Sequence, residues 1–111
     1  MEDPQLTIND PVLRDVVERL TAVFQPDRIY LFGSRARENP GADSDYDLLV
    51  IVPDDASSER KQSHLAYRAL RGTRVAADVL VWTRGDFDSR LHLPASLPAT
   101  VTREGRILYA A

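Results

Sequence analysis

The sequence predicts a small α/β fold, in which a β-sheet is covered by helices. Short apolar runs typical of strands alternate along the chain with segments of helical spacing. The 111 residues suit a single domain with one hydrophobic core, spanning residues 1–111, and the loops are short enough to need no linker. A hydrophobic content of 43% and a charged content of 28% are ordinary for a soluble globular protein.

The N-terminal third predicts a helix followed by a strand. Residues 1–10 are polar and are expected to be loosely ordered. A helix is predicted over Pro11–Phe24, because apolar residues recur there at helical spacing and Asn9 or Asp10 can cap its first turn. The short aromatic and branched run Arg28–Phe32 predicts a strand.

The middle of the chain predicts a turn, a central strand and a second helix. A short helix is expected over residues 34–38, directly after the turn at Gly33. The run Tyr46–Val52 is the most apolar of the chain, so we expect a central strand that is covered on both faces. Residues 59–70 are predicted to form one helix, with Gly72 just beyond its end.

The C-terminal third predicts two more strands and two short helices. Residues 74–82 are expected to form a strand, and Thr83 with Asp86 has the pattern of a capping box that begins a helix. Two prolines keep that helix short or broken. A further helical turn is expected over residues 98–104, followed by a small last strand over residues 106–109.

Composition excludes several classes of function. The formal net charge of −3 provides no basic field, so no direct binding to nucleic acid is expected. The absence of cysteine excludes disulfides and thiolate metal sites, and two histidines, His64 and His92, are too few for a convincing zinc site. Neither a membrane span nor a signal peptide is visible, so a cytoplasmic location is the default expectation. The sequence does not determine the oligomeric state, and a homo-oligomer is compatible with it.

Two carboxylates separated by one residue, Asp45 and Asp47, open the most apolar strand. Side chains alternate along a strand, so both carboxylates are expected on the same face. Like charges this close repel each other unless a cation lies between them. Oxygen ligands suit Mg²⁺, or alternatively Mn²⁺, so the pair predicts a metal site. The competing interpretation is a solvated pair of acids at the end of a loop.

A third acid, Asp78, interrupts the apolar run of residues 75–81. A charge within a buried strand is costly without a partner. We therefore expect its strand to lie beside the strand that carries Asp45 and Asp47, where Asp78 would bind metal with them. The competing interpretation is an acid on a strand edge that faces water.

Gly33 and Ser34 lead from a strand into the predicted short helix. Glycine lets the backbone approach a phosphate, and a helix N-terminus offers free N–H groups. The Ser34 hydroxyl adds a donor, and Arg35 or Arg37 could neutralise phosphate charge, although residues two apart on a helix do not face the same way. An ordinary turn and solvated arginines are the competing interpretations.

Three carboxylates beside a phosphate-binding turn fit two-metal phosphoryl chemistry. In such sites one cation activates the attacking hydroxyl and the other stabilises the leaving oxygens. The predicted catalytic residues are Asp45, Asp47 and Asp78, and Asp78 is also a candidate to accept the proton of the hydroxyl.

The order and spacing of these residues resemble the signature of the DNA polymerase β-type nucleotidyltransferase superfamily. Gly33-Ser34 is followed after ten residues by Asp45-Tyr46-Asp47, and a later strand carries an acid, Asp78. Each short motif alone is weakly specific, but their combination in these strand contexts is strongly specific.

Two stretches resemble one branch of this superfamily closely. Residues 31–37 (LFGSRAR) and 44–48 (SDYDL) are similar to the minimal nucleotidyltransferases, small antitoxins that are paired with HEPN-domain toxins in bacteria and archaea. The resemblance covers roughly residues 12–109.

The resemblance implies a mixed sheet flanked by helices, in a polymerase β-like nucleotidyltransferase fold. It implies Mg²⁺-dependent transfer of a nucleoside monophosphate, usually AMP from ATP, to a hydroxyl with release of pyrophosphate. In the antitoxin branch the acceptor is typically a tyrosine of the partner toxin. By residue match, Gly33 and Ser34 would hold the triphosphate, Asp45 and Asp47 the metals, and Asp78 the third ligand position. The chain lacks the added helices with which larger relatives grip base and acceptor, which implies weak base selection or a partner that completes the site.

Three functions remain in order of preference. The first is an enzyme, a protein adenylyltransferase that acts as an antitoxin on its partner. The second is a non-catalytic antitoxin that masks the surface of its partner, with a weak nucleotide site. The third, transfer to a small molecule such as an antibiotic, is disfavoured by the missing acceptor domain.

Overall fold

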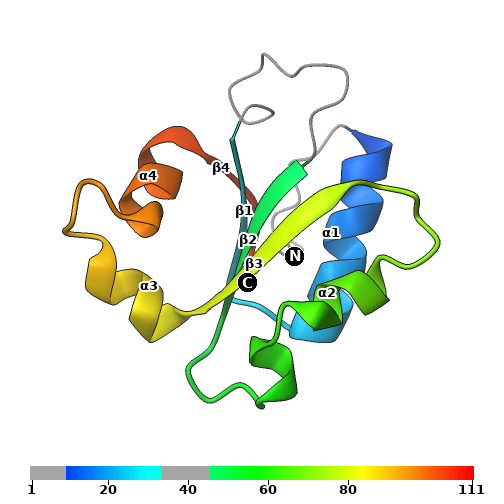
Figure 1. Ribbon diagram of the computed structural model, residues 1–111, viewed down its shortest axis with the longest axis horizontal. Coiled ribbons are helices and arrows are strands. Elements are labelled where there is room, and N and C mark those ends of the chain that lie inside the picture. Colours follow the sequence, from blue (N-terminus) through cyan, green and yellow to red (C-terminus); the bar gives the residue numbers. More distant parts are fainter. Residues whose placement is uncertain (1–9, 34–45) are drawn as a thin grey trace, which may run out of the picture.

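The computed structural model describes residues 10–33 and 46–111, which form a four-stranded β-sheet with helices packed on both faces. Helices lie on either side of the sheet, so the described part has three layers (Figure 1). In chain order the elements are α1 (Pro11–Phe24), β1 (Arg28–Phe32), β2 (Tyr46–Val52), the 3₁₀-helix η1 (Glu59–Lys61), α2 (His64–Ala69), β3 (Ala77–Thr83), α3 (Arg84–Arg90), α4 (Leu97–Glu104) and β4 (Arg106–Ala110).

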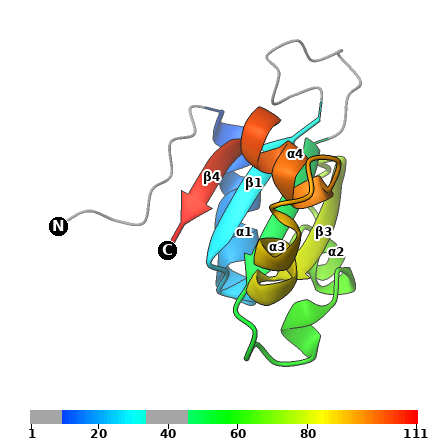
Figure 2. The same cartoon turned by 90° about the vertical axis from the view of Figure 1, so that its left-hand side faces the viewer.

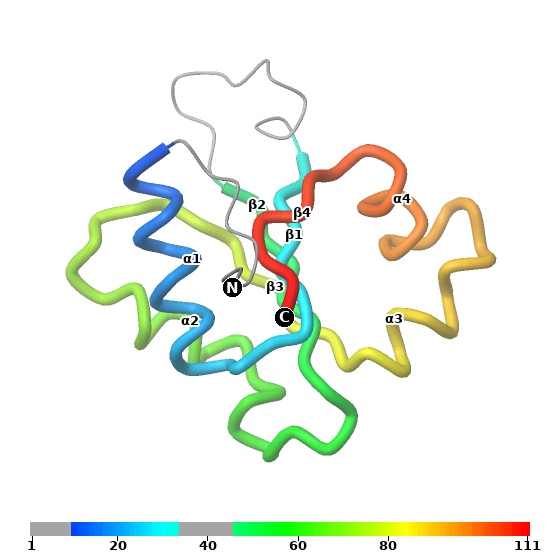
Figure 3. The backbone as a smooth tube through the Cα atoms, turned by 180° about the vertical axis from the view of Figure 1, so that it is seen from behind, coloured from blue at the N-terminus to red at the C-terminus, as the bar shows by residue number. Residues whose placement is uncertain are grey.

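The sheet is mixed, with the strand order β3-β2-β1-β4. Strand β1 pairs antiparallel with β2 and with β4, whereas β2 and β3 run parallel. Helices α3 and α4 lie over the sheet in Figure 2, and β4 is the strand nearest the viewer in Figure 3. The expected α/β fold with a mixed sheet is therefore confirmed, and β2 is a central strand that is covered on both faces as predicted.

Helix α1 begins and ends where the sequence predicts. The carboxylate of Asp10 accepts hydrogen bonds from the backbone N–H groups of Val12 (2.9 Å) and Leu13 (3.4 Å), which satisfies two free donors of the first turn. The helix ends at Gln25, whose φ of 47° is left-handed and turns the chain towards β1.

Each face of the sheet carries its own hydrophobic cluster. The larger cluster lies between the sheet and α1 and α2, and the smaller one lies between the sheet and α3 and α4. In the smaller cluster the ring of Tyr30 stacks on Phe87, with centroids 5.7 Å apart and planes inclined by 15°. The buried members of the smaller cluster are Tyr30, Leu49, Ile51, Phe87 and Val101.

The single helix predicted over residues 59–70 is wrong in its first part. Gln62 has an extended backbone, with φ −102° and ψ 129°, and it separates η1 from α2. Arg60 donates hydrogen bonds to the carbonyl oxygens of Phe24 (2.9 Å) and Gln25 (3.1 Å). These bonds fix η1 against the C-terminus of α1, where a cation is favourable, and the long-range contact overrides the local helical pattern.

The third strand starts three residues later than predicted. Thr73 donates through its hydroxyl to the carbonyl of Leu70 (2.7 Å), and Gly72 and Arg74 both have positive φ, so the chain is still turning at residue 74, where the strand was expected to begin. At the other end of β3 the prediction is confirmed, because the hydroxyl of Thr83 accepts a hydrogen bond from the N–H of Asp86 (3.3 Å) and caps α3.

The remaining predictions divide into confirmed and untested ones. Helix α4 and strand β4 lie where helical and strand segments were expected, each extended by one residue. Two predictions concern residues outside the described ranges. These are the helix over residues 34–38 and the loose order of residues 1–10, of which only residue 10 is described. No helix within residues 10–33 and 46–111 is long and apolar enough to cross a membrane.

Candidate functional site

The candidate site lies where β1 ends and β2 and β3 begin. Gly33 directly follows β1 and has a φ of 76°, a backbone conformation that residues other than glycine rarely adopt. Phe32, the last residue of β1, is in register with Asp47 of β2. The glycine turn and the first acid of the described site are therefore direct neighbours across the sheet.

Gly33 is also required by the space around it. A Cβ atom placed on Gly33 would collide with a carboxylate oxygen of Asp47 and would lie 3.2 Å from its Cγ. The backbone of the turn thus runs against this carboxylate with no room for a side chain. The predicted role of Gly33, which is to let the backbone approach a phosphate, stays a prediction.

Asp78 is in register with Asp47 on the adjacent parallel strand. Neighbouring strands lie about 4.8 Å apart, and residues in register present their side chains to the same face. That face is the α3 and α4 side of the sheet, because Leu49 and Trp82, which alternate in phase with the two acids, belong to the cluster there. The prediction that the third acid lies beside the second is confirmed.

The reason given for that prediction is wrong, because Asp78 is not buried. It lies on β3, the edge strand of the described sheet, and its side chain is exposed, while Asp47 on the central strand is half-buried. The apolar run around Asp78 therefore creates no desolvation cost that a metal must remove. Two carboxylates on adjacent strands still repel each other, and a cation between them remains favourable for that reason.

Helix α4 contributes two residues that sequence reasoning missed. A small cavity of about 140 Å³ adjoins the turn and is lined by Phe32, Gly33, Thr100 and Glu104. Glu104 adds a third acid near this end of the sheet, although its carboxylate is 3.5 Å from Arg103. The spacing of Thr100 and Glu104 by four residues places them on one helical face, but only the tertiary fold brings that face to the turn.

Three predicted site residues, Ser34, Arg35 and Asp45, lie outside the described residues. Their roles in phosphate and metal binding therefore remain predictions. Within residues 10–33 and 46–111, no group of three or more acidic, histidine or cysteine side chains is arranged to hold a metal ion. The described part provides two of the three predicted ligands, Asp47 and Asp78, in adjacent positions.

The donor set fits a hard divalent cation. Asp47 and Asp78 offer only carboxylate oxygens, which are the ligands that Mg²⁺ and Mn²⁺ prefer, and such sites are usually completed by water and by substrate phosphates. The tight turn at Gly33 next to Asp47 offers backbone rather than side chain to whatever lies there. A cation and a phosphate would therefore meet at this end of the α3 and α4 side of the sheet.

Comparison with solved structures shows a related fold. The chain is similar to a crystal structure described as a toxin-antitoxin with AMP-PNP, with a TM-score of 0.57 and 22% sequence identity, over 87% of this chain and 73% of that one. A putative nucleotidyltransferase from Sulfolobus solfataricus gives a TM-score of 0.43 and 19% identity, over 77% of this chain and 85% of that one. No curated protein matches the sequence.

Comparison with protein families is decisive for the classification. Residues 13–106 match the family described as the nucleotidyltransferase domain, and this range contains the turn, both strand acids and α4. The chain therefore belongs to the nucleotidyltransferase-domain family.

Proposed function

We propose that the chain is a Mg²⁺-dependent nucleotidyltransferase that transfers AMP from ATP to a tyrosine hydroxyl of a partner toxin, and so acts as an antitoxin. The partner proposed is a HEPN-domain protein, on the basis of the resemblance of residues 31–37 and 44–48. A structural neighbour is a toxin-antitoxin crystallised with AMP-PNP, which supports both a toxin partner and a nucleoside triphosphate.

One observation carries the proposal. Asp47 and Asp78 are in register on adjacent strands, and the backbone of Gly33 passes so close to Asp47 that no Cβ atom fits between them. A solvated pair of surface acids would need neither the register nor the tight turn. The combination is what a site needs if it binds a phosphate chain and the cation that accompanies it.

The reaction proposed is a displacement at the α-phosphorus of ATP. The acceptor oxygen forms a bond to that phosphorus, the bond from phosphorus to the oxygen that bridges to the β-phosphate breaks, and pyrophosphate leaves. Gly33, with Ser34 and Arg35 as predicted neighbours, would bind the triphosphate. Asp78 is exposed at the open edge of the sheet, so it can accept the proton that the acceptor hydroxyl loses.

The same acids would hold the metal. Asp47 and Asp78 would bind the cation together with Asp45, whose position on the same strand face is predicted from its spacing. When bound, the cation supplies charge neutralisation to the triphosphate and lowers the pKa of the acceptor hydroxyl. Asp47 is fixed by the central strand, which keeps the ligand set oriented before substrate arrives.

The test is a labelling experiment with matched variants. The purified chain is incubated with host lysate, Mg²⁺ and ATP that is labelled at either the α- or the γ-phosphate. We expect a labelled protein band from α-labelled ATP alone, and its loss with Asp47→Asn and with Asp78→Asn. Asp55→Asn is the control, because Asp55 is an exposed aspartate in the loop after β2, at the other end of that strand.

The outcomes separate the competing functions. Label from γ-labelled ATP alone would indicate a kinase and would overturn the proposal. Absence of label from any nucleotide, with retained neutralisation of the partner by Asp47→Asn, would indicate the non-catalytic antitoxin. A labelled band that survives in both acid variants would remove the two acids from the mechanism.

A further inference from the structure

We propose that the open edge of β3 is the docking strand for the acceptor segment of the partner protein. The segment would lie extended along β3, with its tyrosine beside Asp78 and an acidic side chain four residues away, between Lys61 and Arg90. This inference rests on the proposed function, since it concerns how the acceptor hydroxyl reaches the same site.

No described strand pairs with the outer edge of β3. Within residues 10–33 and 46–111, β3 pairs with β2 alone, and Figure 1 looks directly onto its other edge. Leu80, in the middle of the strand, has a relative exposure of 42% although it is large and apolar. An open edge with an exposed apolar side chain can pair with an added strand through backbone hydrogen bonds.

A pocket of about 420 Å³ lies across this edge at the C-terminal end of β3. Its walls include Val81, whose side chain packs on the α1 and α2 side of the sheet, and Trp82, which packs on the α3 and α4 side. Lys61 of η1 and Arg90 of α3 also line it. Because residues from both faces contribute, the pocket faces outward from the strand edge itself.

The charges of the pocket favour an acidic occupant. Arg90 lies over the ring of Trp82, with its guanidinium carbon 5.7 Å from the ring centroid, so a cation–π contact holds it at the pocket wall. Neither Lys61 nor Arg90 forms an ion pair with a carboxylate in the described part of the chain. Asp86 also lines the pocket, so two cations and one anion leave a local charge of +1.

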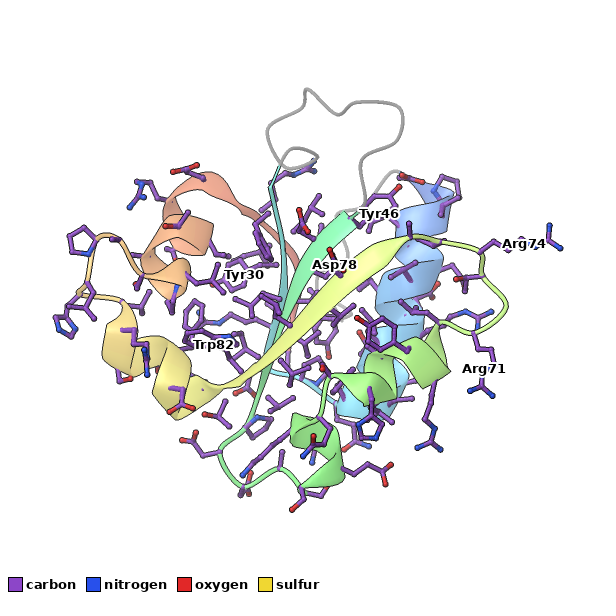
Figure 4. All side chains as sticks on the ribbon, in the orientation of Figure 1. Tyr30, Tyr46, Arg71, Arg74, Asp78 and Trp82 are labelled. Carbon is purple, nitrogen blue, oxygen red and sulfur yellow. The ribbon has the colours of Figure 1, made fainter. Side chains whose placement is uncertain are left out.

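The register fixes the distance between the two contacts. Asp78, Leu80 and Trp82 alternate onto the same face of β3, as Figure 4 shows for the two labelled residues, Asp78 and Trp82. Four residues of strand span about 13 Å. An added strand pairs residue by residue, so a tyrosine opposite Asp78 places the residue four positions away opposite Trp82.

A protein segment fits this surface better than a nucleic acid does. A strand edge offers alternating N–H and C=O groups, which an extended polypeptide matches in spacing. Asp78 lies on the same edge, and its negative charge repels a phosphate backbone. The occupant that satisfies both the backbone and the pocket is therefore an acidic peptide segment that contains a tyrosine.

The test uses synthetic fluorescent peptides that contain one tyrosine and one glutamate in an otherwise neutral sequence. In the first set the glutamate is four residues from the tyrosine, on either side. In the second set the glutamate is two residues from the tyrosine, opposite Leu80 and away from the pocket that Lys61 and Arg90 line. We expect the first set to bind about tenfold more tightly by fluorescence polarisation, which is the effect of one charge-assisted contact. Equal binding of the two sets, or no binding of either, would overturn the proposal.

Charge reversal supplies the matched variants. Arg90→Glu is expected to weaken binding of the first set about tenfold and to favour the same peptides with lysine in place of glutamate. Arg68→Glu is the control, because Arg68 is an exposed arginine on α2 with no ion pair among the described residues. If Arg90→Glu leaves the preference for glutamate unchanged, the pocket does not select the peptide by its charge and the proposal is wrong.

The same peptides distinguish failure of docking from failure of the proposed function. AMP transfer to the peptides that ignores both glutamate spacing and Arg90→Glu would overturn docking on β3 and leave the enzyme intact. Binding that follows spacing and charge, without transfer of label from α-labelled ATP, would support docking and overturn the transferase.

Discussion

Replacing Gly33 with alanine tests whether the close approach of the turn to Asp47 serves catalysis. A φ of 76° costs a residue with a side chain about 1–2 kcal/mol. The added Cβ would also collide with the Asp47 carboxylate, and because ordinary contact requires about 3.5 Å, that carboxylate has to move by about 1 Å. A displacement of this size in a catalytic group lowers the rate about 100-fold.

The chain offers a matched control for the backbone part of this effect. Gly72 has a φ of 89°, but a Cβ atom built on it meets nothing within 4 Å. Gly72→Ala is therefore expected to lose the same free energy of unfolding, about 1–2 kcal/mol, which lowers the Tm by about 4–8 °C for each kcal/mol. It should leave nucleotidyl transfer unchanged.

The measurement compares the two variants in three assays: urea unfolding, the Tm shift caused by Mn²⁺ with ATP, and transfer of AMP from α-labelled ATP. We expect similar losses of stability, with loss of transfer and of the ligand-induced Tm shift in Gly33→Ala alone. If Gly33→Ala retains the transfer rate of Gly72→Ala, the contact between the turn and Asp47 has no catalytic role and the reasoning fails.

Three further substitutions test the packing that supports the site. Arg60→Met removes both hydrogen bonds to the C-terminus of α1 and is expected to lower the free energy of unfolding by about 1–3 kcal/mol in urea titrations, with transfer unchanged; an unaltered urea midpoint would contradict this. Phe87→Ala removes the ring that stacks on Tyr30 and should cost about 3–5 kcal/mol in the same titration, whereas a loss below 1 kcal/mol would show that the smaller cluster tolerates a cavity. Gly105→Ala would place a Cβ atom 2.8 Å from the carbonyl oxygen of Leu31, so we expect a loss of about 1–3 kcal/mol, and hydrogen exchange should show the loosening at the start of β4.

Elements with strong local signals could be predicted from the sequence. Helix α1 has a capping carboxylate, a proline in its first turn and regular apolar spacing, and its bounds are those predicted. Strand β2 has an apolar run, interrupted by Asp47 alone, that is followed by a proline, and it is central as predicted. In both cases the information lies within a few residues of the element.

Features that depend on distant contacts could not be predicted. The break at Gln62 follows from hydrogen bonds between Arg60 and the end of α1, which lies 35 residues away. The approach of Glu104 to the turn at Gly33 depends on how α4 packs against β1. No local pattern distinguishes these residues from other polar positions on helices.

The exposure of Asp78 shows how one pattern can lead to the right position for the wrong reason. An apolar run with one acid looks the same in a buried strand and in an edge strand, because the burial of a strand depends on its neighbours. The position of its strand beside the strand of Asp47 was predicted correctly, but the energetic argument assumed burial that the edge position of β3 removes.

The edge position gives the two acids different abilities within one site. Asp47 is half-buried on a central strand between two paired neighbours, so its carboxylate is held in place and is suited to fixing a cation. Asp78 is exposed on a strand whose outer edge pairs with no described strand, so a large acceptor can approach it without breaking a pairing of the described sheet. A proton acceptor for a protein hydroxyl needs that access, whereas a residue that only binds metal does not. Thermal unfolding of one variant separates the two roles. If Asp78 only accepts the proton, Asp78→Asn should abolish transfer while Mn²⁺ with ATP still raises the Tm as in the unaltered chain; loss of the Tm shift as well would show that Asp78 binds the metal.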